Sequence, residues 1–214
     1  MPVPIPTPIF RIVHVDCLPT LLQRAGLHGA NHCPADGRPY RTIHNVEIQG
    51  VRHVRNIPCG PGGTLHDYVP FYFGYLSPML FQLKTGRVTG YNEGQEPLVY
   101  LKTTVQAVES AGLGFVFSDG HGIAAFTSWH DQSAQLTQVD WNMVYQRYWR
   151  DEVGDMDRQR RKQAEFLIHR ACPWAVIQEI GVANVVMKTR VEAILNGFPA
   201  AMRTVVNVHA GWYY

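Results

Sequence analysis

The sequence lacks the features that mark several common protein classes. Its four cysteines form no CxxC pair and show no zinc-finger spacing, so neither a disulfide framework nor a structural zinc site is expected. No apolar run approaches the roughly 18 residues that a membrane helix needs. The proline-rich start MPVPIPTPIF has no basic region followed by an uninterrupted apolar one, which argues against a signal peptide. We therefore expect a cytoplasmic protein that does not associate with a membrane.

Several catalytic motifs are absent as well. No GxGxxG leads from a strand into a helix and no P-loop pattern occurs, which disfavours Rossmann-type dinucleotide binding and phosphoryl transfer. The ten histidines include no HExxH pair, and no serine lies in a GxSxG sequence. We expect neither a bound metal nor acyl transfer by a serine or cysteine nucleophile.

The composition is that of a folded protein with a sizeable core. With 214 residues, 46% hydrophobic and 17% charged, the chain fits one domain over residues 1–214. A net charge of +2 is too small to attract a polyanion by itself, so such a partner would need a local cluster. One cluster exists within DRQRRKQ: Arg158, Arg160, Arg161 and Lys162. On composition alone, this cluster is a solvated loop of mixed charge.

Hydrophobic periodicity predicts strands interleaved irregularly with short helices. Strands are expected over 9–15, 98–102 and 114–118, from about Glu165, within 174–183 and within 204–214. Helices are expected over 17–25 with Gly26 as terminator, from 103 to 110, over 139–149 with Asp140 as N-cap, and over 184–197. Residues 44–58 fit either a helix or an extended segment. The pattern favours a mixed α+β fold over a doubly wound one.

The segment HDYVPFYFGYLSPML, residues 66–80, has five aromatic rings and no charge after Asp67. In a strand, alternate side chains face opposite sides, so Val69, Phe71 and Phe73 would fill the core while Tyr68 and Tyr72 face a site. Prolines cannot donate to a sheet ladder. Pro70 and Pro78 should therefore keep this segment at a sheet edge or in a cleft.

Four polar residues stand in apolar surroundings: His14, Arg52, His121 and Glu165. A carboxylate at the start of a strand and after a long loop is a common placement for a catalytic group, because the strand holds it rigidly. Taken singly, each also has an ordinary explanation as a hydrogen-bonded or solvated residue.

Seven motifs, taken in order, favour the catalytic interpretation of these residues over the ordinary one. They are TPIFRIVHVD, DYVPFYFGYLSPML, EPLVYLKTTVQAVE, FVFSDGH, VDW, RQRRKQAEFLI and WYY, and they span almost the whole chain. In content and separation they closely resemble the DarT family of DNA ADP-ribosyltransferase toxins.

The resemblance implies an ADP-ribosyltransferase fold, in which a split, mixed β-sheet core surrounded by helices holds NAD in a cleft. It implies transfer of ADP-ribose to a base, most often thymidine, in single-stranded DNA, with release of nicotinamide. By motif position, Glu165 matches the catalytic glutamate and Arg52 the catalytic arginine, with Arg55 as the alternative. For NAD, the matching positions are His14, Tyr72, Met79 and His121. A macrodomain antitoxin of the DarG type is the expected partner.

These side chains suit the implied chemistry. Breaking the bond between nicotinamide and ribose builds positive charge on the sugar, which the Glu165 carboxylate can stabilise. The attacking thymine nitrogen must lose a proton, and Glu165 or a neighbour can accept it. Arg52 can hold a pyrophosphate or steady the base. The cations of the DRQRRKQ cluster lead into Glu165, so we expect them to bind the DNA backbone in a salt-dependent way.

The chain departs from the family pattern at two positions. Leu76 stands where many relatives carry an arginine before SPML, and Cys17 where asparagine is frequent. Both leave the target base open, so guanine, RNA and protein remain alternative acceptors. An inactive nucleic-acid-binding module is the alternative from another class, although the presence of both Arg52 and Glu165 argues against it.

Overall fold

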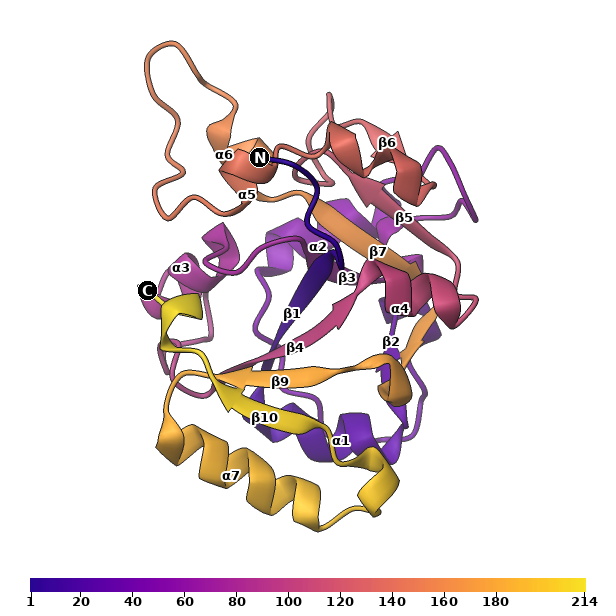
Figure 1. The fold of residues 1–214 in the computed structure, drawn as a ribbon, viewed down its shortest axis with the longest axis vertical. Coiled ribbons are helices and arrows are strands. Elements are labelled where there is room, and N and C mark those ends of the chain that lie inside the picture. The colour runs from indigo at the N-terminus through magenta and orange to yellow at the C-terminus, as the bar shows by residue number, and fades with distance from the viewer.

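The computed structural model describes residues 1–214 and is built on an eight-stranded mixed sheet beside a two-stranded one (Figure 1). The strands are β1 (Pro8–His14), β2 (Gly26–His28), β3 (Tyr68–Tyr72), β4 (Leu98–Thr104), β5 (Phe115–Ser118), β6 (Trp129–His130), β7 (Glu165–His169), β8 (Ala171–Pro173), β9 (Glu179–Val182) and β10 (Val205–Val208). The large sheet has the order β10-β9-β4-β1-β3-β7-β5-β6, and β2 pairs with β8. In the large sheet only β9 and β10 run parallel, so the sheet is mixed.

The large sheet is split in its middle, between β1 and β3. These two strands share one residue pair, Phe10 with Tyr72, whereas β1 follows β4 along its whole length. Pro70 explains the split. A residue's N–H and C=O point to the same side of a strand, and the Pro70 carbonyl accepts from Arg11 Nη1 of β1 at 2.8 Å. The side facing β1 therefore lacks the N–H that a continued ladder would need.

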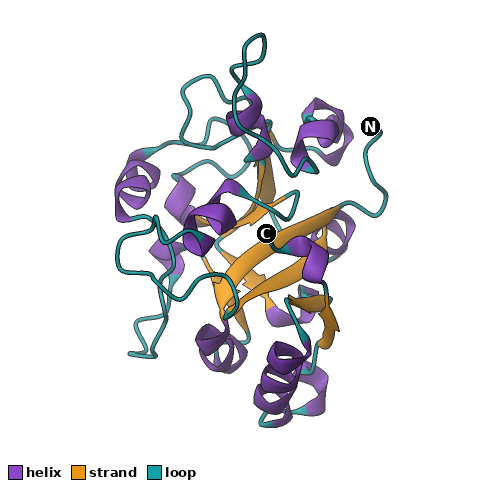
Figure 2. Cartoon of the chain, turned by 90° about the vertical axis from the view of Figure 1, so that its left-hand side faces the viewer, coloured by secondary structure: helices purple, strands orange, loops and turns teal.

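Seven helices surround the sheet (Figure 2). Side-chain caps begin five of them. They are α1 (Leu18–Gln23), α2 (Val46–Val54), α3 (Pro78–Lys84), α4 (Val105–Ser110), α5 (Trp141–Val144), α6 (Arg158–Lys162) and α7 (Val185–Asn196). The Asn45 side chain accepts from two backbone N–H groups of α2, and Ser77 caps α3 with Pro78 in its first turn. None of the helices is long and apolar enough to cross a membrane.

The aromatic run from Tyr68 to Phe73 divides its side chains as expected. Val69, Phe71 and Phe73 are fully buried in the main core, and Tyr68 and Tyr72 line a cavity on the other face. Pro70 lies in the wall of that cavity but not on an edge strand, because β3 lies between β1 and β7 in the sheet. Pro78 is not in a strand at all, since it opens α3.

Three sequence-based boundaries were wrong. Ala25, not Gly26, takes the left-handed conformation after α1, with φ of 52°, and Gly26 starts β2. The helix expected over 139–149 ends at Val144, although Asp140 caps it as predicted. The last strand ends at Val208, and a single turn over 210–212 follows it.

Candidate active site

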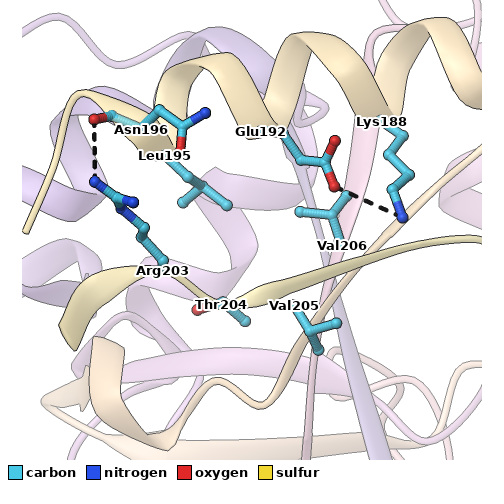
Figure 3. Close-up of a pocket in the computed structure, with 8 residues that line it drawn as sticks. All are labelled: Lys188, Glu192, Leu195, Asn196, Arg203, Thr204, Val205 and Val206. Carbon is cyan, nitrogen blue, oxygen red and sulfur yellow. Dashed lines mark hydrogen bonds and ion pairs between the residues drawn. The ribbon is translucent and has the colours of Figure 1, made fainter. Parts of the chain in front are cut away.

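The opening between β1 and β3 leads into a cavity of about 430 Å³. Its wall includes five residues that the sequence singled out: Arg52, Tyr72, Met79, His121 and Glu165. A smaller hollow of about 200 Å³ lies between α7 and β10, at the β10 edge of the sheet (Figure 3). Its charged groups pair with each other or with backbone, as in Lys188 with Glu192 and Arg203 with the Asn196 carbonyl. The larger cavity is therefore the candidate active site.

A buried ion pair lies in the wall of this cavity. Arg52 Nη1, from α2, donates to both Glu165 carboxylate oxygens, at 3.1 Å to Oε1 and 2.9 Å to Oε2. The two side chains are 8% and 2% exposed. Arg52 Nη2 is buried and has no hydrogen-bond partner in the protein. The pair thus keeps one donor for a ligand in the cavity.

Backbone geometry fixes the Glu165 carboxylate from a second side. Glu165 is the first residue of β7, and its own N–H donates to Ser118 Oγ at 3.2 Å. The Gly122 N–H donates to Glu165 Oε1 at 3.0 Å. A Cβ at residue 122 would lie 3.1 Å from that oxygen, so only glycine lets the backbone approach without displacing it. Gly122 had not been identified from the sequence.

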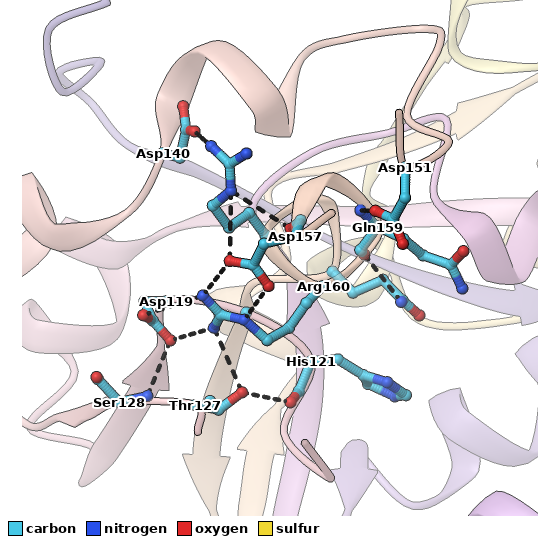
Figure 4. A network of polar contacts seen from close by, with 12 residues as sticks. Asp119, His121, Thr127, Ser128, Asp140, Asp151, Asp157, Gln159 and Arg160 are labelled. Carbon is cyan, nitrogen blue, oxygen red and sulfur yellow. Dashed lines mark hydrogen bonds and ion pairs between the residues drawn. The ribbon is translucent and has the colours of Figure 1, made fainter. Parts of the chain in front are cut away.

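The turn that carries His121 and Gly122 is anchored by Arg160 (Figure 4). The His121 N–H donates to the Arg160 carbonyl at 2.9 Å. The Arg160 guanidinium donates to Asp119 at 2.7 Å and to Asp157 at 2.7 and 2.8 Å. Thr127 Oγ1 in turn donates to the His121 carbonyl at 2.7 Å. Burial lowers the pKa of His121, against the opposing effect of Glu165, so the ring is neutral at neutral pH.

Tyr72 and Met79 lie together in the cavity wall. The Tyr72 hydroxyl is 4.0 Å from Met79 Sδ, and Tyr72 is the register partner of Glu165 across β3 and β7. Burial raises the pKa of Tyr72 far above its usual value, so the phenol keeps its proton. The result is a flat, largely apolar wall next to the carboxylate.

His14 is not among the residues that line the cavity. It ends β1 with its ring buried, and its Nδ1 accepts from the Asp16 N–H at 3.2 Å. Its Nε2 lies 3.4 Å from a Glu93 carboxylate oxygen, and Glu93 also pairs with Arg41. Burial lowers the pKa of His14, and Asp16 opposes that effect. Contact between His14 and a ligand would therefore require Glu93 to move.

The structure separates the two arginine candidates. Arg52 meets Glu165, whereas Arg55 follows the end of α2 and donates from Nη2 to the Ala124 carbonyl at 3.0 Å. Arg55 does not line the cavity. Within a helix, residues three positions apart lie on nearly the same face. Arg55 does not share the face of Arg52, because α2 ends at Val54 and Arg55 is extended.

The basic cluster lies mostly in ion pairs within the protein. Arg158 pairs with Glu152, Arg160 with Asp119 and Asp157, and Arg161 with Asp140 and Asp155. Each arginine is partly exposed. Lys162 differs, because it is 4% exposed and its ammonium donates to backbone carbonyls. The structure does not present Lys162 to a surface ligand, contrary to its expected place among the DNA-binding cations.

Arg11 is a cavity residue that had not been identified from the sequence. It lies on β1 at the split, where Nη1 is held by Pro70 and Nε is buried without a partner. Arg11 and Arg52 thus both carry an unpaired buried nitrogen in the cavity wall. Such donors fit an anionic ligand such as the pyrophosphate of a dinucleotide. A charged side chain inside the apolar alternation of IFRIVHV was the available sequence signal.

A mixed sheet split between two central strands, with a buried arginine–glutamate pair beside the opening, defines a protein of the ADP-ribosyltransferase fold class. Comparison with known proteins narrows this class. A family model described as "ssDNA thymidine ADP-ribosyltransferase, DarT" matches residues 10–214. The chain belongs to the DarT family, which confirms the resemblance seen in its motifs.

Curated relatives share nearly the whole chain. A DNA ADP-ribosyl transferase of Thermus sp. (strain 2.9) is 42% identical over 211 residues, covering 99% of this chain and 98% of the relative. One from Escherichia coli O127:H6 is 34% identical, with coverage of 96% and 93%.

Solved structures agree with the fold. Thermus sp. 2.9 DarT in complex with ADP-ribosylated ssDNA is similar with a TM-score of 0.94 and 40% identity, covering 100% of this chain and 99% of the other. The same protein with NAD+ gives a TM-score of 0.88 at 39% identity, with 100% of each chain covered. Thermosipho africanus DarTG, at 16% identity and a TM-score of 0.76 over 96% of this chain and 50% of that one, shows likeness of fold alone. The expected split mixed-sheet fold is confirmed.

Proposed function

We propose that this protein transfers ADP-ribose from NAD to a thymidine base in single-stranded DNA and releases nicotinamide. Membership of the DarT family supports the reaction class. The observation that carries the proposal is the buried contact of Arg52 with Glu165 in the wall of the cavity at the sheet split.

Glu165 performs the central step. As the bond between ribose and nicotinamide breaks, the leaving ring takes the bonding electrons and positive charge develops on the sugar. A carboxylate fixed by Arg52 and the Gly122 N–H needs no reorganisation to stabilise that charge. The thymine nitrogen then forms the new bond to the sugar, and Glu165 accepts the proton that this nitrogen loses.

Arg52 and the aromatic wall orient the reactants. Arg52 holds Glu165 through Nη1 and offers the unpaired Nη2 to the substrate. Tyr72 and Met79 bind the flat nicotinamide ring, and the neutral His121 lies beside the carboxylate as a hydrogen-bonding group. His14 contacts the adjoining ribose once Glu93 moves aside. Arg11 adds a contact to the pyrophosphate.

The remaining assignments concern the partners. Arg158, Arg160 and Arg161 bind the DNA backbone, and they do so by exchanging part of their internal ion pairs for phosphate. The protein acts as a cytoplasmic toxin whose partner is a DarG-type macrodomain antitoxin. Membership of the DarT family, whose resemblance implied such an antitoxin, supports the pairing.

Mass spectrometry of oligonucleotides incubated with NAD tests the proposal. Wild-type protein should add one ADP-ribose to a thymidine-containing DNA strand and none to strands of the same length without thymidine. Glu165→Gln keeps the size of the side chain and should lower the rate about 10³-fold while NAD still binds by calorimetry. A mass gain on guanosine or ribonucleotide strands alone would instead support the alternative acceptors.

A further inference from the structure

The segment between α5 and α6, residues 145–157, projects from the body of the protein (Figure 1). Tyr148 is 80% exposed as a residue, and Val153 and Met156 are also largely in water. Arg147 and Arg150 on the same segment are exposed. An exposed ring among cations and apolar groups is the surface that single-stranded nucleic acid uses for base stacking and phosphate contact. We name residues 145–157 the projecting loop.

Lys162 ties the start of the projecting loop to the body. Its ammonium donates to the carbonyls of Val144 at 2.7 Å, Gln146 at 2.6 Å and Tyr75 at 3.4 Å. Burial lowers the pKa of Lys162 to about 7, with no carboxylate close enough to oppose it, so its N–H groups serve these backbone carbonyls. The residue precedes Glu165 by only three positions. It therefore joins the loop to the strand that carries the carboxylate.

The Tyr214 hydroxyl makes a second, separate tie. It accepts from Trp149 Nε1 of the projecting loop at 2.7 Å and donates to the Leu76 carbonyl. The Phe81 ring packs edge-on against both Trp149 and Tyr214. Leu76 has φ of 55°, an uncommon conformation for a residue with a side chain. Its carbonyl and that of Tyr75 thus anchor the loop at adjacent positions.

We propose that Lys162 and Tyr214 are positioning residues that hold the projecting loop where it receives single-stranded DNA at the Glu165 end of the cavity. The inference rests on the proposed function. Neither side chain lines the cavity. Their loss should therefore weaken the use of DNA while leaving the binding of NAD unchanged.

The first test compares two neighbouring tyrosines. Tyr214→Phe removes the tie to Trp149, whereas Tyr213→Phe removes bonds to the Leu98 and Gly181 carbonyls, at 2.9 and 3.1 Å, which lie in the sheet. Tyr214→Phe should raise both KM and Kd for a labelled thymidine-containing oligonucleotide roughly two- to ten-fold, the range of one net hydrogen bond. Tyr213→Phe should lower the melting temperature more than Tyr214→Phe does, and it should leave KM and Kd for the oligonucleotide unchanged. Calorimetry should give wild-type NAD affinity for each.

A double-mutant cycle isolates the contact itself. Trp149→Phe removes the other partner of the bond, so the double variant with Tyr214→Phe should bind DNA no more weakly than the weaker single variant. Additive losses, or wild-type DNA affinity in Tyr214→Phe, would overturn the assignment of Tyr214.

Lys162→Met tests the other tie, because methionine fills the space but cannot donate. It should raise Kd for the oligonucleotide with unchanged NAD affinity, and wild-type DNA affinity in this variant would overturn the assignment of Lys162. These binding measurements do not depend on turnover. If wild-type protein binds DNA but forms no adduct, the proposed function fails while the comparison of affinities still decides the role of the loop.

Discussion

Arg52 and Glu165 meet through a single nitrogen, since Nη1 donates to both carboxylate oxygens while Nη2 stays without a protein partner. The guanidinium thus fixes the orientation of the carboxylate and still presents a donor to the cavity. Removing either partner would leave the other charge buried and uncompensated. Stability and catalysis should therefore both respond to changes at this pair.

Arg52→Ala should lower the rate of ADP-ribose transfer by about 10²–10³-fold, because the carboxylate loses its fixed donor. It should also lower the free energy of unfolding by about 3–5 kcal/mol, since Glu165 is left unpaired. Arg55→Ala is the matched control and should transfer within a few-fold of wild type. Initial rates and urea unfolding measure both effects. A larger loss of rate in Arg55→Ala would reverse the assignment of the two arginines.

Gly122→Ala should displace the Glu165 carboxylate, because the added methyl would lie 3.1 Å from Oε1. We expect the turnover number to fall about ten-fold or more, with the loss of one backbone donor as the physical cause. Gly50→Ala in α2 has no atom within 4 Å of its added methyl and should leave the rate unchanged while stabilising the helix by about 0.5–1 kcal/mol. Wild-type turnover in Gly122→Ala would show that the close approach is not needed.

Arg160→Gln should affect both catalysis and DNA binding, whereas Arg158→Gln should affect DNA binding alone. Arg160 anchors the His121–Gly122 turn through Asp119 and Asp157, so its loss should lower the turnover number as well as the affinity for DNA. Arg158 pairs only with Glu152 and the Tyr148 carbonyl. Its loss should weaken DNA binding evenly across sequences and reduce the slope of log affinity against log salt by about 1. Anisotropy titrations at several salt concentrations, with initial rates, measure both; equal kinetic effects would refute the distinction.

Glu179 should make stability depend on pH in acid. Burial raises the pKa of Glu179, but hydrogen bonds from Lys102, His209 and Asn207 outweigh it and lower the pKa to about 2. The folded state therefore binds the proton less readily than the unfolded chain does. The stabilisation is present above the ordinary value of 4.5 and is lost as pH falls towards about 2, at up to about 3 kcal/mol. The free energy of unfolding of the wild type, measured in urea, should therefore fall over this pH range. That of Glu179→Gln should change less with pH.

The central site was largely predictable from sequence because its residues stand out locally. Periodicity placed Glu165 at the start of a strand, which the structure confirms. It left the segment around Arg52 open between a helix and an extended chain, and the structure shows a helix. Their contact was not predictable from spacing, since 113 residues separate them. The family motifs supplied that connection.

The role of the basic cluster was less predictable, because charge alone does not identify a partner. Asp119 and Asp140, which pair with Arg160 and Arg161, lie 41 and 21 residues away in sequence. Lys162 has no acidic partner and depends on carbonyls that only the folded chain brings together. From sequence alone, a run of cations suggests an exposed basic surface. In this fold the same side chains are mostly engaged in ion pairs and hydrogen bonds within the protein.

The opening between β1 and β3 depends on the backbone at Pro70 more than on most of the side chains that line the cavity. Because Pro70 has no N–H and the Arg11 side chain occupies its carbonyl, the ladder between β1 and β3 stops there, and residues of the wall other than these two could be exchanged without sealing the opening. Side chains that contact NAD and side chains that contact the DNA base could thus be changed separately. Replacing Pro70 by a residue with an N–H would favour further hydrogen bonds between β1 and β3 and so close the opening.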